Sequence, residues 1–317
     1  MYFLGVDGGG TKTQVILADK NANILGVSRV GSTYIRSITK ELLYETLEEG
    51  ISLALKDASL ETGKIGIEKS CFGIAGLDNP HDFELLASCV KELKSVKLDA
   101  NPLLLNDAVC ALRRGTYEPF GVVIVAGTGS NCYGKNKQGQ SVFVGGLGHI
   151  LTDEGGSYFV GSQVLHSAAK SYDGRIEKSL LEQYVYESFG VMNMRDVILK
   201  VHERTFGKRE IASLAMICEK AAKENDKEAI RILKEAASEA ILMISTAIKK
   251  LGMIDDSFDL VCVGGGFKNP TGPMRIDFEM FVRQNFVQAK IIYPTSEPAM
   301  GAVFLAIDAC NCAVPSV

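Results

Sequence analysis

The sequence predicts an α/β protein of two domains, and three observations support this. Its 317 residues are about twice the ~150 residues of a typical domain. Apolar, β-prone runs alternate with amphipathic helical segments along the chain. A glycine-rich strand–turn–strand pattern opens the chain and recurs about 116 residues later, counted from Gly5 to Gly121. We therefore expect an internal duplication in which one such hairpin opens each of two similar domains.

Strands and helices alternate through the first half of the chain. The three N-terminal apolar runs are joined by turn-like segments, which predicts an antiparallel meander. Farther on, apolar residues recur at helical spacing in some segments and form continuous runs in others. The expected strands are 2–7, 14–19, 24–28, 71–76 and 102–105, and the expected helices are 39–58, 80–94 and 108–114.

The second half opens with the recurring hairpin pattern and then becomes mostly helical. The segment from Lys227 to Leu251 is the clearest helix, because its apolar side chains form one face and its Lys and Glu side chains the other. The remaining expected elements are a hairpin over 121–133, helices between 160 and 250, short strands at 260–263 and 291–294, and a final helix over 297–310.

The composition excludes several classes of protein. The 34 Lys and Arg and 38 Asp and Glu residues give a net charge of −4, whereas a nucleic-acid partner needs a basic face. No run approaches the ~18 apolar residues that span a bilayer. The N-terminus lacks the basic start and cleavage site of a signal peptide. We therefore expect a cytoplasmic protein that binds neither nucleic acid nor membrane.

The eight cysteines include no C-x-x-C pair. Cys310 and Cys312 form a C-x-C motif, but no second pair stands at the spacing of a zinc site. We expect free thiols, in keeping with the rarity of disulfides in the cytoplasm.

The glycine-rich turn at residues 8–13 indicates a phosphate site, because small residues let backbone N–H groups approach phosphate oxygens. It is not a Walker loop, since Thr11 stands where that motif needs Lys and a strand-like run follows in place of a helix. A dinucleotide fingerprint starting at Gly127 also fails, because Cys132 occupies the position of its third glycine. We interpret the turn as a hairpin phosphate grip in which Thr11 and Thr13 contribute hydroxyl and backbone donors.

A second loop, Gly127 to Ser130, has the same character as the first. One such turn alone is equally well explained as a plain β-turn, whereas two facing hairpins could clamp one polyphosphate. Asp7, at the end of the first strand, is placed to hold Mg²⁺ through water. Thirteen of the 32 glycines lie in five clusters, and we expect these loops to converge on one cleft: 8–10, 127–129, 145–148, 155–156 and 264–266.

Asp107 is the candidate catalytic base. It directly follows an apolar strand and precedes a helix, the usual place for a site residue in an α/β sheet. Transfer of a phosphoryl group to an alcohol needs a carboxylate that orients the hydroxyl and accepts its proton. The alternative is that Asp107 only caps the helix that follows it.

Asp153 and Glu154 follow another glycine-rich stretch, residues 145–148. Acidic side chains in such a loop can accept hydrogen bonds from sugar hydroxyls, although a helix cap or a polar turn explains them equally well. His149 has no partner at metal-ligand spacing, and we expect it to be structural.

Together these segments resemble the actin-like ATPase superfamily of sugar kinases, actin and heat-shock chaperones. Within it, the N-acetylglucosamine kinase and BadF/BadG group is most similar. The segments that carry the resemblance occur in the family's order and span nearly the whole chain: 7–13, 106–108, 127–132, 145–149, 153–155 and 264–266.

The resemblance implies two ribonuclease-H-like domains around an interdomain cleft, residues 1–116 and 117–296, with a last helix at about 297–317 returning to the first. It implies ATP- and Mg²⁺-dependent phosphorylation of an amino sugar at its 6-hydroxyl, with Asp107 as the base. The residues implied in ATP binding are Gly9, Gly10, Thr11, Lys12, Thr13, Gly127, Thr128, Gly129, Ser130, Gly264, Gly265 and Gly266, and those implied in sugar binding are Ser32, Asn106, Asp107, Thr128, Asn131, Gly146, Leu147 and Asp153. Kinases of this group are often homodimers, although no feature of the sequence shows it.

Two positions depart from the pattern of the animal enzymes. Tyr34 stands where they have a sugar-contacting Asn, and Leu147 replaces a Trp. A different pocket wall could admit N-acetylmuramic acid or glucosamine besides N-acetylglucosamine. Two other classes stay open as alternatives. An ATPase activator of 2-hydroxyacyl-CoA dehydratases would carry a Gly-Gly-Gln-Asp pattern that is missing here. A non-enzymatic sugar sensor would carry a DNA-binding segment ahead of the first hairpin.

Overall fold

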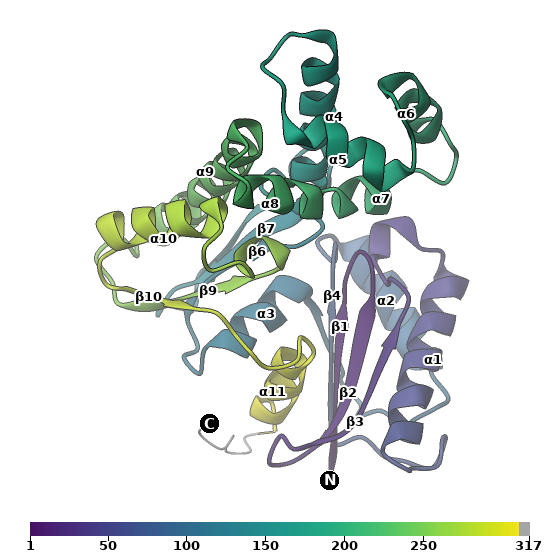
Figure 1. The fold of residues 1–317 in the computed structure, drawn as a ribbon. Coiled ribbons are helices and arrows are strands. Elements are labelled where there is room, and N and C mark those ends of the chain that lie inside the picture. The colour runs from purple at the N-terminus through teal and green to yellow at the C-terminus, as the bar shows by residue number, and fades with distance from the viewer. Residues whose placement is uncertain (311–317) are drawn as a thin grey trace. The chain divides into compact units, whose positions relative to one another are not determined.

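The computed structural model describes residues 1–310, which fold into two compact α/β units. Unit 1 contains Met1–Gly121 and the segment that starts at Pro294, and unit 2 contains Val122–Tyr293. Each unit is built on one five-stranded sheet with helices around it (Figure 1).

Unit 1 holds the predicted meander at its N-terminus. Its strands are β1 (Tyr2–Gly8), β2 (Thr13–Asp19), β3 (Ile24–Val30), β4 (Lys69–Ile74) and β5 (Leu103–Asn106), and its helices are α1 (Lys40–Asp57), α2 (Pro80–Glu92), α3 (Asp107–Gly115) and α11 (Met300–Asp308), with a 3-10 turn η1 at Ile35–Ser37. The strand order is β3-β2-β1-β4-β5. Strands β1 to β3 pair antiparallel, and β4 and β5 run parallel to β1.

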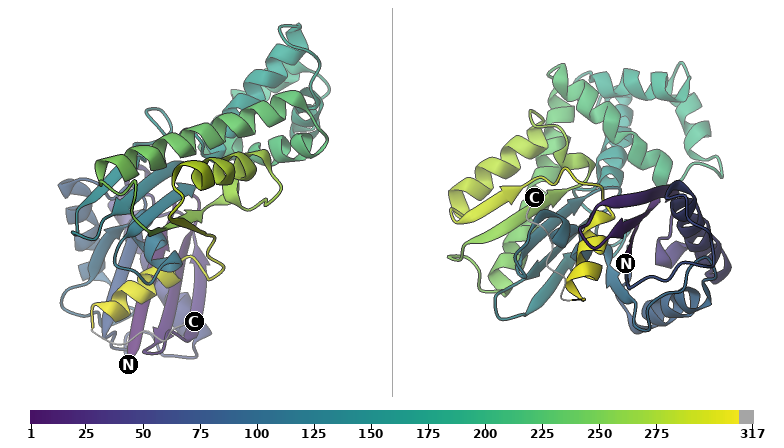
Figure 2. Two further views of the ribbon diagram at one scale, coloured as in Figure 1. Left: turned by 90° about the vertical axis from the view of Figure 1, so that its left-hand side faces the viewer. Right: turned by 90° about the horizontal axis from the view of Figure 1, so that it is seen from below.

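Helices cover both faces of this sheet. On one face, Leu47 of α1 and Leu86 of α2 pack in a cluster with Leu4. On the other face, α3 and α11 form a separate cluster in which Val303 packs with Phe3. Figure 2 shows α11 lying beside the strands of unit 1. Successive residues of a strand point to opposite faces, so the neighbours Phe3 and Leu4 belong to different clusters. Burial on both faces accounts for the continuous apolar runs of these strands.

Helix α11 packs so closely on α3 and β1 that their backbones are in contact. A Cβ atom added to Gly301 would overlap the carbonyl oxygen of Cys110 in α3, and one added to Gly5 would lie 2.7 Å from the carbonyl oxygen of Ala299. The side chains of Arg113 and Asp308 form an ion pair at 2.7 Å between the same two helices. Glycine is therefore required at these positions by close packing.

We predict that Gly301→Ala lowers the free energy of unfolding by about 1–3 kcal/mol, because overpacking the α3–α11 contact outweighs the better helix propensity of alanine. The measurement is urea unfolding followed by circular dichroism. Gly66→Ala in the same unit is the control, since a Cβ there would meet no atom within 4 Å. Equal stabilities for the two variants would contradict the prediction.

Unit 2 repeats this plan and adds helices. Its strands are β6 (Gly121–Ala126), β7 (Ser130–Lys135), β8 (Ser141–Gly145), β9 (Phe258–Val263) and β10 (Ala289–Ile292), and its helices are α4 (Ser157–Asp173), α5 (Leu180–Phe189), α6 (Met194–Val201), α7 (Lys208–Ser213), α8 (Ala215–Lys223), α9 (Lys227–Lys250) and α10 (Pro273–Asn285), with a 3-10 turn η2 at Gly265–Phe267. In Figure 2, α9 runs as a long rod across unit 2, and α10 lies against it.

The two sheets have the same topology, which confirms the predicted duplication. Read in the same direction, the order in unit 2 is β8-β7-β6-β9-β10, and each strand takes the place of its counterpart in β3-β2-β1-β4-β5. Strand β9 runs parallel to β6, as β4 does to β1. The helices α4 to α9 lie in the chain between β8 and β9, where unit 1 has only η1 and α1.

Most predicted elements are confirmed within a few residues, and the differences have local causes. Strand β8 is not among the predicted strands, because it lies at the edge of its sheet and its half-exposed residues form no buried run. The last helix begins at Met300 and not at residue 297. The segment before it is held by β2, since the side chain of Gln14 donates to the Glu297 carboxylate and accepts from the backbone N–H of Ala299.

Within residues 1–310, no helix is both long and apolar enough to cross a membrane. The cysteines described in this range are free thiols. Cys312 lies outside the described residues, and with it the Cys310–Cys312 motif.

Candidate active site

The carboxyl ends of the parallel strands β1, β4 and β5 meet at one edge of the unit 1 sheet. The register pairs Gly8 with Ile74 and Ile74 with Asn106, so the residues at the ends of β1 and β5 are brought together. Sites in α/β sheets form at such edges. Asp7 and Asp107, far apart in sequence, both lie here.

Hydrogen bonds hold the base of the loop between β1 and β2, and its tip is exposed. The backbone N–H of Gly9 donates to the carbonyl of Lys12 at 3.0 Å, and the Ser32 hydroxyl donates to the carbonyl of Gly9 at 2.9 Å. The Thr13 and Thr33 hydroxyls share a hydrogen bond at 2.8 Å. Gly10 at the tip is exposed. The tip thus offers polar groups to a ligand, while Ser32, a predicted sugar residue, supports the loop.

Asn106, not Asp107, caps helix α3. Its side-chain oxygen accepts from the backbone N–H of Ala108 at 3.0 Å, and its amide group donates to Asp78 at 2.9 Å. Asp78 is in turn paired with Arg36 at 2.8 Å. The alternative explanation of Asp107 as the helix cap is therefore wrong, because its neighbour already fills that position.

The two carboxylates of this edge have raised pKa values. Burial raises the pKa of Asp107 to about 7, and the negative charge of Asp7 adds to the effect. Burial also raises the pKa of Asp7 to about 6, against the opposing charges of Arg114 and Lys12. A carboxylate whose pKa lies near neutral pH is suited to accept a proton from an alcohol.

In unit 2, three glycine-rich loops converge. The carbonyl of Gly127 accepts from the backbone N–H of Ser157 at 2.8 Å, and a Cβ on Gly156 would lie 2.6 Å from the carbonyl carbon of Gly129. Gly264 has a φ of +107°, and a Cβ there would overlap the carbonyl group of Ala126. The loops at 127–130, 153–157 and 264–266 are therefore in direct backbone contact, which larger residues would prevent.

Asp153 is held in a strained conformation beside the loop at residues 127–130. Its φ is +75°, which is unusual for a residue other than glycine. Its side chain is buried, lies against the Cα of Gly129, and pairs with the Lys208 ammonium at 3.4 Å. Strain of this kind persists only where the surrounding structure enforces it and is concentrated at functional sites.

Asn131 presents a polar atom that has no protein partner among the described residues. Its side-chain oxygen is buried and accepts no hydrogen bond. The side chain packs against Gly146, whose φ of +74° and missing Cβ leave room for it. Leu147, the next residue, is 52% exposed. A buried acceptor without a donor indicates a ligand that supplies one.

A pocket of about 350 Å³ opens beside the third glycine loop. Gly265 and Gly266 form one side, and α8 forms another. Its wall contains the buried side chains of Leu233 and Met274 and the exposed side chain of Met216. A largely apolar pocket next to a glycine-rich loop suits a nucleoside.

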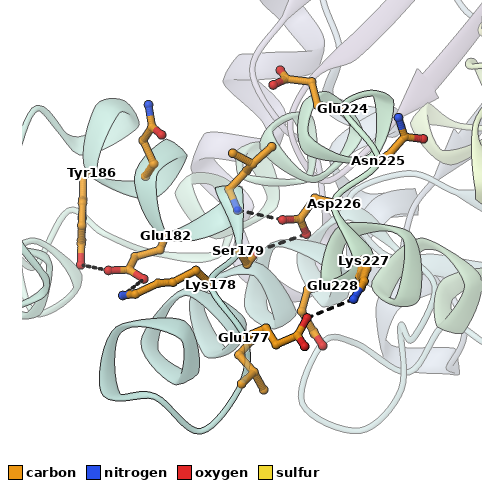
Figure 3. Close-up of a pocket in the computed structure, with 13 residues that line it drawn as sticks. Glu177, Lys178, Ser179, Glu182, Tyr186, Glu224, Asn225, Asp226, Lys227 and Glu228 are labelled. Carbon is orange, nitrogen blue, oxygen red and sulfur yellow. Dashed lines mark hydrogen bonds and ion pairs between the residues drawn. The ribbon is translucent and has the colours of Figure 1, made fainter.

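Figure 3 shows a larger pocket, of about 820 Å³, among the helices of unit 2. Its charged side chains already have partners, some within the pocket and some outside it, such as Tyr184 for Glu224 and Arg231 for Glu228. Asp226 caps α9 and accepts from the Ser179 hydroxyl and the Leu180 backbone N–H, and Glu182 accepts from Lys178. This network joins the N-termini of α5 and α9, and we assign no binding role to the pocket.

The predicted site residues fall into one group in each unit. Unit 1 holds Asp7, Gly9, Gly10, Thr11, Lys12, Thr13, Ser32, Asn106 and Asp107, and unit 2 holds Gly127, Thr128, Gly129, Ser130, Asn131, Gly146, Leu147, Asp153, Gly264, Gly265 and Gly266. Within unit 2, all three loops assigned to phosphate, sugar and adenosine meet. The sequence did not predict that Lys208 pairs with Asp153 or that Met216 of α8 lines a pocket. A lysine or methionine in an amphipathic helix indicates only a surface position.

Comparison with known proteins agrees with this geometry. The chain matches the BadF/BadG/BcrA/BcrD ATPase family over residues 4–306. It is 33% identical over 315 residues to the N-acetylmuramic acid/N-acetylglucosamine kinase of Clostridium acetobutylicum, covering 98% of this chain and 99% of that protein. It is 30% identical to the N-acetyl-D-glucosamine kinase of Dictyostelium discoideum, covering 96% and 98%.

The fold has a solved counterpart. A candidate N-acetylglucosamine kinase from Chromobacterium violaceum superposes with a TM-score of 0.77 at 20% identity, over 96% of this chain and 98% of that one. The predicted fold class, two α/β domains of the actin-like ATPase type, is confirmed. From the match over residues 4–306 and the identity to its relatives, the chain is a member of the BadF/BadG/BcrA/BcrD ATPase family.

Proposed function

We propose that this protein is an ATP-dependent kinase that transfers the γ-phosphoryl group to the 6-hydroxyl of an amino sugar, N-acetylglucosamine or N-acetylmuramic acid. The observation that carries the proposal is Asp107, a carboxylate that directly follows β5, is not the N-cap of α3, and has its pKa raised by burial to about 7. The relatives named as kinases of these two sugars support it along the whole chain.

Asp107 is assigned the role of general base. Its carboxylate orients the sugar 6-hydroxyl and takes its proton as the hydroxyl oxygen bonds to the γ-phosphorus. The bond between that phosphorus and the oxygen bridging to the β-phosphate breaks, and ADP leaves. The sugar-binding group is Ser32, Asn106, Thr128, Asn131, Gly146, Leu147 and Asp153, and the unpartnered oxygen of Asn131 supports its inclusion.

The glycine loops are assigned to the nucleotide. Residues 9–13 and 127–130 would hold the phosphates, and Gly264, Gly265 and Gly266 would face the nucleoside in the adjoining pocket. Mg²⁺ fits the single carboxylate of Asp7, because this ion keeps several waters and takes few protein ligands when it binds phosphates. When bound, it would neutralise charge on the β- and γ-phosphates. We also propose that the enzyme acts in the cytoplasm.

The test is a coupled assay of ADP release with ATP, Mg²⁺ and a panel of N-acetylglucosamine, N-acetylmuramic acid, glucosamine and glucose. We expect sugar-dependent turnover with at least one of the N-acetylated sugars. Turnover that no sugar stimulates would contradict the proposal. Iron in the purified protein would instead favour the dehydratase activator.

The pKa of Asp107 predicts the pH dependence of the reaction. A carboxylate acts as a base only when ionised, and its raised pKa means that it takes up a proton at a higher pH than an ordinary aspartate. We expect kcat/KM to fall as the pH drops through about 7. A direct assay of sugar phosphate across pH 5 to 9 measures this. A kcat/KM that stays constant down to pH 5, as a base with the ordinary pKa of about 4 would give, would contradict it.

A further inference from the structure

We propose that Lys208 is a specificity residue that favours amino sugars bearing a carboxylate, such as the lactyl ether of N-acetylmuramic acid, over neutral ones. The inference rests on the proposed function, because it requires the sugar to bind beside Asp153. Lys208 is the first residue of α7, and no sequence motif contains it.

The position of Lys208 is the first support. Its ammonium lies 3.4 Å from the carboxylate of Asp153, which is buried against Gly129 at the phosphate loop. The Asp153 side chain is 7% exposed and that of Lys208 is 29% exposed. The lysine thus reaches from the accessible side toward a buried carboxylate that we place in the sugar site.

The fixed backbone position of Lys208 is the second support for the inference. A Cβ on Gly161 of α4 would overlap the carbonyl oxygen of Ile211 in α7, so the two helices are in backbone contact. The first turn of α7 is fixed as well, because the backbone N–H of Gly207 donates to the Glu210 carboxylate at 2.9 Å. The base of the lysine side chain is therefore rigidly placed, as a specificity residue requires.

The positive charge of Lys208 is the third support for the inference. A sugar carboxylate that approaches this loop meets the negative charge of Asp153, and a nearby cation must offset it. His149 does not serve, because burial and the charge of Lys208 lower the pKa of its imidazole. A lysine ammonium has three donors and can bond to Asp153 and a second carboxylate together. A neutral sugar can accept a hydrogen bond from this ammonium but gains no ion pair.

The test compares the parent with Lys208→Gln on three substrates: N-acetylglucosamine, N-acetylmuramic acid, and the methyl ester of N-acetylmuramic acid, which has nearly the same shape without the charge. Loss of one charge-assisted hydrogen bond should raise the KM for N-acetylmuramic acid about tenfold or more. The kcat should change little, and the KM for the other two sugars should rise by no more than a few-fold, as far as the loss of the pairing with Asp153 affects all sugars alike. Lys200→Gln on α6, an exposed lysine paired with Glu203, is the matched control.

The outcomes separate the inference from the proposed function. Equal loss on all three sugars would overturn the inference, since Lys208 would then act only by orienting Asp153. A parent enzyme that phosphorylates N-acetylglucosamine but not N-acetylmuramic acid would also overturn it and leave the kinase function intact. Lack of turnover with every sugar would contradict the kinase function itself.

Discussion

Asp107→Asn should lower the kcat of sugar phosphorylation about 10³-fold and leave the KM values for ATP and sugar within a few-fold of the parent. The amide has nearly the same size and can still accept a hydrogen bond from the 6-hydroxyl, so substrate binding is retained. It cannot take up the proton, and the alcohol must then attack without a base. Coupled measurement of ADP release, with sugar phosphate quantified directly, checks both constants.

The same substitution carries its own test of folding. The pKa of Asp107 is about 7 in the folded protein against an ordinary value of 3.8, so the carboxylate lowers stability progressively as the pH rises from about 4 to about 7. Asparagine removes this penalty. Asp107→Asn should therefore melt at a higher temperature than the parent at pH 8 and at a similar temperature at pH 4.

Two results would contradict this assignment. A variant with normal melting that keeps more than about a tenth of the parent kcat would show that Asp107 is not the base. A variant that melts lower than the parent at both pH values would show that the carboxylate has a structural role that the asparagine cannot fill.

Much of the fold could be predicted because its strands are buried on one or both faces. The run from Phe3 to Val6 is fully apolar or glycine, and it forms the central strand β1. The long helix α9 has a sharp apolar face, with Ile244 and Ile248 buried at the predicted spacing. Strand β8 was harder to predict because an edge strand needs no continuous apolar run.

The site was only partly predictable for a different reason. The glycine clusters and Asp107 can be recognised in the sequence. Close backbone contact restricts a position to glycine, and proton transfer restricts it to a few residue types. Either Asn106 or Asp107 could cap α3, because both residue types are good N-caps and they are adjacent in the chain. The choice depends on their side-chain rotamers, and only the structure shows that Asn106 accepts from the backbone N–H of Ala108. Lys208 joins Asp153 from 55 residues away in the chain, through packing of α7 on α4 that no local pattern encodes.

The glycine loops of unit 2 offer a test of their convergence within a single turn. Gly127 and Gly129 lie two residues apart and differ sharply in the space around them. A Cβ on Gly127 would meet nothing nearer than an oxygen at 3.9 Å, an ordinary contact. A Cβ on Gly129 would overlap the carboxylate of Asp153 and lie 2.7 Å from its Cγ atom.

Gly129→Ala should therefore lower kcat/KM for both substrates about 10²-fold or more, because Asp153 must move out of its enforced conformation and misplace a group of the sugar site. Gly127→Ala, which adds the same methyl group to the same loop, should lose far less. Steady-state kinetics with ATP and sugar varied in turn measures the effect, and thermal melting shows whether the variants stay folded. Similar losses in the two variants would mean that the loop tolerates no side chain at all near the phosphates. The contact between Gly129 and Asp153 would then not be the reason that the loop requires glycine.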